Sequence, residues 1–256
     1  MIPRINSCRP LVSLVTLIAV GVCLFFIHAK QNQISLDEFN REKFKERNGQ
    51  EILTQLPLPI AYSPEFSEKW QYRRVHLQGS FLPEHEVYLE NRTSEDAPKP
   101  ISKKTSGFHI MMPFLLDSGE IVWVNRGWIK RDLVDRQNIP VVKTNSGKQV
   151  LNGYISIARK DIFEMPDEKP HIINGHVVAL NFYLHDDKKE LPNRNVYPFL
   201  ITQTGGSSDG LIRPEEGFYY TPDYSFDLKT WWFTLLITIG FWLVSGIIKL
   251  RETPRS

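Results

Sequence analysis

The amino-acid sequence predicts a mainly β protein, an antiparallel β barrel or sandwich that forms an outer domain between two terminal transmembrane helices. Apolar runs lie near both ends of the chain, at 11–27 and 231–248, and each is long enough to cross a hydrocarbon layer about 30 Å thick as a helix. No comparable run lies between them, and from Trp70 onward short β-rich segments alternate with turn residues. The layout therefore predicts two membrane anchors around one water-exposed β domain.

The flanking charges predict how the chain crosses the membrane. Arg4 and Arg9 precede the first run, and Lys249, Arg251 and Arg255 follow the second. Because Lys and Arg near span ends mark the cytoplasmic side, both termini are predicted inside and the middle of the chain outside. The predicted parts are a cytoplasmic N-terminus (1–10), a transmembrane helix (11–28), a periplasmic β-rich domain (29–230), a second transmembrane helix (231–248) and a cytoplasmic C-terminus (249–256).

The first apolar run has a second interpretation, as the core of a signal peptide cleaved after Ala29. The run is longer than a usual signal core, and Ile27 stands where a small residue is expected before the cleavage site. An uncleaved anchor is therefore predicted. No Arg- and Ser-rich amphipathic presequence comes before the run, which favours a bacterial inner membrane over the mitochondrial inner membrane.

Composition excludes several classes of function. The chain has 31 Lys and Arg against 29 Asp and Glu, a net charge of +2, and no basic cluster interleaved with aromatic residues, so nucleic-acid binding is not predicted. Both cysteines, Cys8 and Cys23, lie at or inside the first run. The outer domain is therefore predicted to contain no disulfide, no thiol nucleophile and no thiolate metal site.

The outer domain is predicted to begin with a short charged helix, Leu36–Arg47, capped by Ser35 with Glu38 in a capping box. A proline-stiffened connector at 56–60 follows. Polar residues 99–106 predict a loop, Asp117–Glu120 a hairpin turn, and 182–190 one or two helical turns. Seven β-rich segments are predicted as strands: 72–78, 86–89, 108–116, 121–129, 150–158, 176–182 and 196–203.

No motif predicts catalysis. The sequence has no P-loop, HExxH or GxGxxG string, so an enzyme is not predicted, and a periplasmic hydrolase is an unsupported third class. His109 and Met111 would share a strand face and could form a soft copper site, but an ordinary half-buried strand face is favoured. His28, at the outer end of the first run, could ligate a haem iron or be an ordinary interfacial polar residue.

The most specific local string is Val122–Ile129, where a strand ends in Asn125-Arg126-Gly127 and Trp128 follows. Glycine permits a positive φ or a close backbone approach, and arginine can hold a carboxylate or a backbone carbonyl. One interpretation is a structural corner tied by Arg126 and packed by Trp128. The other is a grip for a carboxylate or a haem propionate beside an aromatic wall. Chemistry alone favours the corner.

At these residues the sequence resembles the Surfeit-locus (Surf/Shy) family of cytochrome c oxidase assembly factors. The resemblance follows the chain in order and is clearest from about residue 70 to 130. It comprises the strand Tyr72–Gly79, the segment 86–92 that ends in Asn91-Arg92, the segment Gly107–Phe114 with Pro113, and Val124–Ile129 with its Asn-Arg-Gly-Trp block. The two terminal spans around one outer domain also agree with the family.

The sequence departs from the family at both membrane borders. His28–Gln31 stands where the family usually has Gly-x-Trp-Gln after the first span. Aligned on Trp232-Phe233, Ser225 occupies the position of a histidine that has been linked with haem binding in the family. The resemblance thus implies a divergent member whose haem role is altered or lost unless another ligand, such as His28, compensates.

The resemblance implies an inner-membrane factor that assists assembly of a haem-copper terminal oxidase. It implies binding and hand-over of haem to the catalytic subunit, with that subunit and other assembly factors as partners. The expected haem contacts are Arg126, toward a propionate, Trp128 and His28. The expected docking or structural residues are Asn91, Arg92, Pro113, Asn125, Arg126, Gly127, Trp128, Trp232 and Phe233. The alternative is a membrane-tethered periplasmic scaffold for another envelope complex, without a cofactor.

Overall fold

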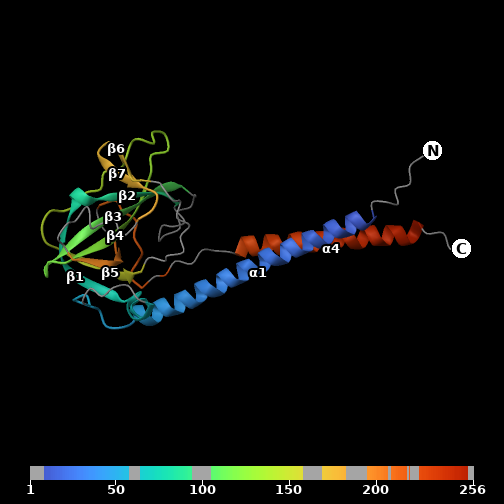
Figure 1. Cartoon of the computed structure of the whole chain (residues 1–256), viewed down its shortest axis with the longest axis horizontal. Helices are drawn as coiled ribbons and strands as arrows, with labels where there is room; N and C mark the ends of the chain where they lie inside the picture. The colour runs from blue at the N-terminus through green and yellow to red at the C-terminus, as the bar shows by residue number, and fades with distance from the viewer. Residues whose placement is uncertain are drawn as a thin grey trace. The chain divides into compact units, whose positions relative to one another are not determined.

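The computed structural model describes residues 9–57, 64–93, 105–157, 169–182, 195–206, 209–217, 219 and 225–252. The chain divides into two compact units, which are described separately. The helix unit comprises Met1–Asn40 and Thr221–Ser256, and the barrel unit comprises Arg41–Tyr220. Figure 1 traces both in chain order. The predicted loop at 99–104, the helical turns after Phe182 and the last residues of the connector (58–60) lie outside the described residues.

Helix α1 is a single helix of 40 residues, Arg9–Asn48. The prediction of a separate short helix over Leu36–Arg47 is therefore wrong, and so is the capping box at Ser35, which lies inside the helix. The stretch 28–35 contains neither glycine nor proline, so nothing stops the helix where the apolar run gives way to charged residues. Of the described helices, this one is long and apolar enough to cross a membrane, over Leu14–Asn48.

In the helix unit, α1 lies beside α4 (Ser225–Glu252), as Figure 1 shows. Phe26 stacks on Trp231 with ring centroids 4.4 Å apart, and the Lys30 ammonium lies 3.1 Å from the Asp227 carboxylate. Cys23, Ile27 and Leu235 form the buried contact between the two helices. Because the paired positions rise in α1 as they fall in α4, the helices are antiparallel.

The barrel unit contains one sheet of eight strands with the order β1-β5-β8-β4-β3-β2-β7-β6. A further pairing of β1 with β3 closes five strands into a barrel, and β2, β7 and β6 continue the sheet beyond β3 (Figure 1). The strands are β1 (Arg74–Phe81), β2 (Val87–Thr93), β3 (Ser106–Leu116), β4 (Ile121–Lys130), β5 (Gln149–Ser156), β6 (His171–Ile173), β7 (His176–Ala179) and β8 (Val196–Gln203).

The predicted barrel is confirmed, but its purely antiparallel character is not. Strand β4 pairs with β8 in parallel, and β2 pairs with β7 in parallel, while the remaining ladders are antiparallel. Long connections bring β7 and β8 back in the direction of their partners, and hairpin spacing cannot reveal this. All seven predicted strands are present: 196–203 has the same bounds as β8, and the other six have one or both ends shifted. The three-residue β6 and the seven-residue α2 (Pro64–Trp70) were not predicted because they are short. The 3-10 turn η2 (Pro83–His85) follows β1 at a proline, a residue typical of turns.

Strand β3 is shared by two neighbours along one edge. Its first half, up to Met111, pairs with β2, and its last three residues, from Phe114, pair with β1. Pro113 lies between the two ladders, where its missing N–H leaves no ladder bond unmade on that edge. Its carbonyl accepts a hydrogen bond from the Leu82 N–H at 3.0 Å. Pro113 thus marks the place where β1 replaces β2 and the barrel closes.

The barrel interior is filled by alternate apolar side chains of the closed strands. Helix α2 contributes Phe66, which stacks on Phe199 with ring centroids 5.6 Å apart. At the closing ladder a Cβ on Gly79 would lie 2.2 Å from the Leu115 carbonyl oxygen, so only glycine lets β1 approach β3 closely enough to pair. The other buried members include Val75, Leu77, Phe81, Met112, Phe114, Leu116, Val122, Val124, Leu151, Ile155, Tyr197 and Ile201.

Candidate functional site

The pairs Asn91-Arg92 and Asn125-Arg126 lie at two β-bulges on either side of β3. In β2 the register shifts between Leu89 and Arg92, and Asn91 there has a φ of 59°. In β4 the register shifts so that Arg126 is the extra residue, between Asn125 and Gly127. Bulges bend a strand and re-aim its side chains. The motif therefore encodes two local departures from regular sheet.

The β4 bulge requires glycine. Gly127 has a φ of 133°, and a Cβ there would lie 2.6 Å from the Ile212 carbonyl oxygen. A side chain would meet both backbone strain and a backbone clash. The Gly127 N–H donates to Asn125 Oδ1 at 3.1 Å, and the Asn125 amide also contacts His109 Nδ1 at 3.3 Å. Asn125 therefore fixes the bulge from its own side chain.

A segment far along the chain packs on this bulge. We call residues 209–213 the strap. Trp128 and Ile212 exchange two backbone hydrogen bonds of 2.8 Å, and the loop that carries the strap is closed by the Gly205 N–H donating to the Pro214 carbonyl at 3.0 Å. The strap thus adds to the β4 edge immediately beyond the ladder with β8, whose last partner on β4 is Asn125.

A buried charge cluster joins the strap to the bulge. The Arg126 side chain is 4% exposed, and its guanidinium lies 2.9 Å from the Asp209 carboxylate. Arg213 donates to the same carboxylate and to the Arg126 carbonyl. Arg126 also lies over the Phe81 ring at 4.7 Å. Burial lowers the pKa of the Arg126 guanidinium while Asp209 opposes that shift, and arginine stays protonated in such a site.

The Asn91-Arg92 pair is linked to the Asn125-Arg126 pair through Trp128. The Trp128 side chain is 1% exposed, and its indole N–H donates to the Arg92 carbonyl at 3.3 Å. The Arg92 guanidinium donates to the Leu180 carbonyl at 3.1 Å. The structure therefore brings Arg92, Asn125, Arg126, Gly127 and Trp128 together, and in the part of the chain that it describes Arg126 and Trp128 are already engaged with protein partners.

Sequence reasoning missed three charged residues of this cluster: Asp209, Arg213 and Glu86. Asp209 is 83 positions from Arg126, and nothing in the local string around it indicates a partner. Glu86 precedes β2, and burial raises the pKa of its carboxyl group against the opposing effects of Tyr88 and Arg126. Its Oε1 atom is buried and accepts no hydrogen bond. Among the described residues, Glu86 thus joins Arg126 and Arg213 as a charged group near the cluster with one buried polar atom that has no hydrogen-bond partner.

Other predicted residues lie elsewhere. In the helix unit, His28 is exposed on α1, with its Nε2 atom 3.1 Å from the Asn32 amide, and Trp232 and Phe233 are exposed on α4. Ser225 begins α4, and its side chain lies outside the described residues. Met111 is buried in an apolar cluster, and among the described residues no group of His, Cys, Asp and Glu is arranged to hold a metal.

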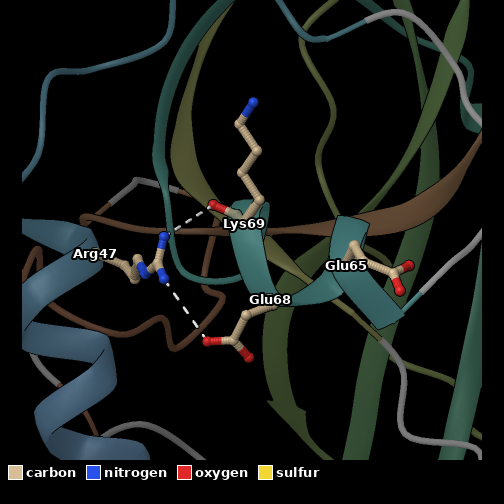
Figure 2. A pocket seen from close by; sticks show the side chains of 4 residues that line it. All are labelled: Arg47, Glu65, Glu68 and Lys69. Atoms are coloured by element: carbon tan, nitrogen blue, oxygen red, sulfur yellow. Dashed lines mark hydrogen bonds and ion pairs between the residues drawn. The ribbon is translucent and has the colours of Figure 1, made fainter.

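Figure 2 shows a surface depression where the end of α1 meets α2. Arg47 donates to the Lys69 carbonyl at 3.4 Å and lies 3.7 Å from the Glu68 carboxylate, to which Lys43 is also bound. The bond from Lys43 is the main reason that the pKa of Glu68 is lowered. Charged side chains line this depression, and their contacts hold the last turns of α1, which belong to the barrel unit, on α2.

Comparisons with known proteins point to one family. A family model described as the SURF1 family matches residues 28–219. The chain is 33% identical over 87 residues to the cytochrome oxidase assembly protein SHY1 of Saccharomyces cerevisiae, a match that covers 33% of this chain and 20% of that protein. It is 26% identical over 173 residues to a SURF1-like protein of Rickettsia bellii, with 63% and 67% covered. It is 24% identical over 210 residues to a SURF1-like protein of Caenorhabditis elegans, with 73% and 59% covered.

Replacing Asp209 by Ala should destabilise the barrel strongly. Two buried guanidinium groups would lose their shared carboxylate, and breaking a buried ion pair from one side costs about 3–5 kcal/mol. The free energy of unfolding of the purified full chain in detergent measures this. The matched control is Asp117→Ala, which removes a carboxylate from an exposed pair with Lys148 and should cost no more than about 1 kcal/mol. Equal losses in the two variants would contradict a structural role for the buried cluster.

Glu86 should make the barrel less stable as pH rises. Because the pKa of Glu86 is raised above 4.5 in the folded chain, the folded state keeps a proton that the unfolded chain has released. The free energy of unfolding therefore falls as pH rises from about 4.5 through the raised value. Glu86→Gln should flatten this slope in titrated denaturation curves, while Glu84→Gln, the same change on the adjacent turn, should keep it. A slope unchanged in Glu86→Gln would refute the assignment.

Proposed function

Since the chain belongs to the SURF1 family, we propose that it is an assembly factor for a cytochrome oxidase. The observation that carries the proposal is the family match over residues 28–219, which includes the whole strand sequence and both bulges. The family resemblance predicted from the ordered segments between about residues 70 and 130 is confirmed by that match. The assembly role is taken from a relative named as a cytochrome oxidase assembly protein. More specifically, we propose that the oxidase is a haem-copper terminal oxidase and that the chain acts on its catalytic subunit.

The proposed mode of action is binding. Arg126, Asp209 and Arg213 hold the strap on the bulge, and Trp128 joins the two bulges. These contacts tie the strap and the two bulges together, which suits a protein that presents a pre-organised surface to a partner, because such a surface loses little freedom on association.

Haem handling is a separate proposal, and the described residues fit it unevenly. A haem group requires an axial ligand and an apolar pocket. Arg126 and Trp128 do not fit, because both side chains are buried and hold protein partners. His28 fits as a ligand donor, since its imidazole is exposed on α1. We propose His28 as the residue of this chain that would contact haem.

We further propose that both helices of the helix unit cross the membrane of a bacterial cell, with the barrel unit on the outer side. The contacts Lys30–Asp227 and Phe26–Trp231 place the ends of the apolar runs 11–27 and 231–248 beside each other. Two runs of similar length that pair antiparallel suit one hydrocarbon layer. The ion pair then lies just outside the layer, and the Trp231 ring lies at its border.

Cysteine labelling should confirm this topology. In a chain with Cys8 and Cys23 replaced by Ser, Asp135→Cys should react with a membrane-impermeant thiol reagent in cells whose outer membrane is permeabilised. Ser256→Cys should react only after the inner membrane is broken. Labelling of both positions before lysis would contradict a two-span hairpin.

Deleting the gene should lower the amount of active oxidase in the membranes. We expect the reduced-minus-oxidised haem spectrum of the membranes to lose its oxidase signal together with oxidase activity, and the intact gene should restore both. Asp209→Asn tests the link to the barrel. It should restore the oxidase only in proportion to the folded protein present, because Asp209 acts through stability. Unchanged spectra and activity in the deletion strain would overturn the assembly proposal and favour a scaffold for another complex.

Haem content of the purified chain tests His28. If His28 contacts haem, His28→Ala should lower the haem bound per protein severalfold in a haemochrome assay without changing the melting temperature. His171→Ala, at another exposed histidine, should leave the haem content unchanged. A colourless wild-type protein, or equal haem in both variants, would remove His28 from the proposal.

A further inference from the structure

The connection from β4 to β5 contains a loop whose backbone is fixed by its own side chains. The Asp132 carboxylate accepts hydrogen bonds from the Val134 N–H at 2.8 Å and the Asp135 N–H at 3.1 Å. Its second oxygen accepts one from the Asn138 amide at 2.8 Å. These bonds lower the pKa of Asp132, that from Asn138 most. Loops of this length without regular structure are uncommon in compact domains and are often functional.

The rest of the sheet also holds the loop. Arg131 donates to the Arg136 carbonyl at 3.1 Å, and its guanidinium lies 3.1 Å from Glu90 of β2. The Asn174 amide, at the turn between β6 and β7, donates to the Gln137 carbonyl at 2.8 Å. Figure 1 shows the loop beside that turn. Contacts with β2 and with the turn between β6 and β7 therefore hold the loop against the sheet.

The fixed loop exposes two apolar side chains at its tip. Leu133 is 62% exposed and Val134 is 97% exposed, whereas Ile139 farther along the loop is buried in the core. Leu133 and Val134 thus contribute little to the packing of the barrel. Two large apolar groups held in water by a pre-ordered backbone match the anchor residues of protein interfaces, where little freedom remains to be lost on binding.

The charges around the tip distinguish between two kinds of surface. Asp132 and Asp135 flank Leu133-Val134 directly, and Arg136 follows. Insertion into a bilayer would carry both carboxylates toward anionic headgroups and out of water, which is unfavourable. An apolar pocket on a protein, with a polar rim that offers a basic group to Asp135 and an acidic group to Arg136, accommodates the same arrangement.

We propose that Leu133 and Val134 form a docking tip that enters an apolar, charge-rimmed pocket on a protein partner. Resting on the proposed function, that partner is a subunit of the oxidase under assembly. The tip lies on the barrel unit and is separate from the bulges and the strap, so its loss should impair binding while the barrel stays folded.

The test uses the full chain in its native membranes. Leu133→Ser with Val134→Ser should lower the oxidase haem signal and oxidase activity by about tenfold, the effect of removing interface anchors, at an unchanged level and melting temperature of the protein. The matched control is Ile172→Ser, which removes an apolar side chain that is 75% exposed on the edge strand β6 and should leave the oxidase unchanged. A photo-crosslinking residue at 134, and not at 172, should attach to an oxidase subunit.

The outcomes of this test distinguish the docking tip from the proposed assembly function on which it rests. If deletion of the gene removes the oxidase but the double variant restores it fully, the docking tip is wrong and the assembly function stands. If deletion has no effect on the oxidase, the assembly function fails first. Cross-links from position 134 to lipid alone would replace the protein pocket by a membrane surface and overturn the proposal as stated.

Discussion

The barrel unit depends on one buried carboxylate that two arginines share. Asp209 lies on a strap that contacts β4 through a single pair of backbone hydrogen bonds, so backbone pairing alone would hold it weakly. With Arg126 on the bulge and Arg213 on the strap both bound to Asp209, the cluster satisfies buried charges that would each be costly alone. The same cluster explains why Arg126 is the extra residue of the bulge, since only a re-aimed side chain reaches the strap.

Two residues with unusual backbone properties, a glycine and a proline, set the geometry around this cluster. Gly127 permits the approach of Ile212, and Pro113 lies where β3 changes partners from β2 to β1. Both lie in the segments that carry the family resemblance. The motif is thus explained by barrel closure and bulge formation, and the corner interpretation of Asn125–Trp128 accounts for each contact that the structure describes there.

This arrangement bears on how an assembly factor of this kind would work. The charged groups of Arg126 and Asp209 contact one another inside the barrel unit, whereas the exposed apolar groups include Leu133 and Val134 of the docking tip and residues of α1 and α4. A barrel with exposed contact groups fits the proposed roles in binding and positioning. The proposed haem contact, His28, belongs to the helix unit, so the proposed haem role is separate from that of the barrel.

The sequence by itself determined the features that depend on neighbouring residues. It predicted seven strands, because each has a local pattern of β-branched and aromatic residues. It also predicted the hairpin turn at Asp117–Glu120, where Gly119 has a positive φ of 100°. It also predicted the family, because ordered short strings carry that signal. The tertiary structure decided the rest. The parallel pairing of β4 with β8 and the meeting of Arg126 with Asp209 across 83 positions depend on long-range packing, which leaves no periodicity in one sequence. The continuation of α1 past Ser35 has a different reason. A capping pattern that could start a helix at Ser35 does not interrupt a helix that has already formed over the preceding residues.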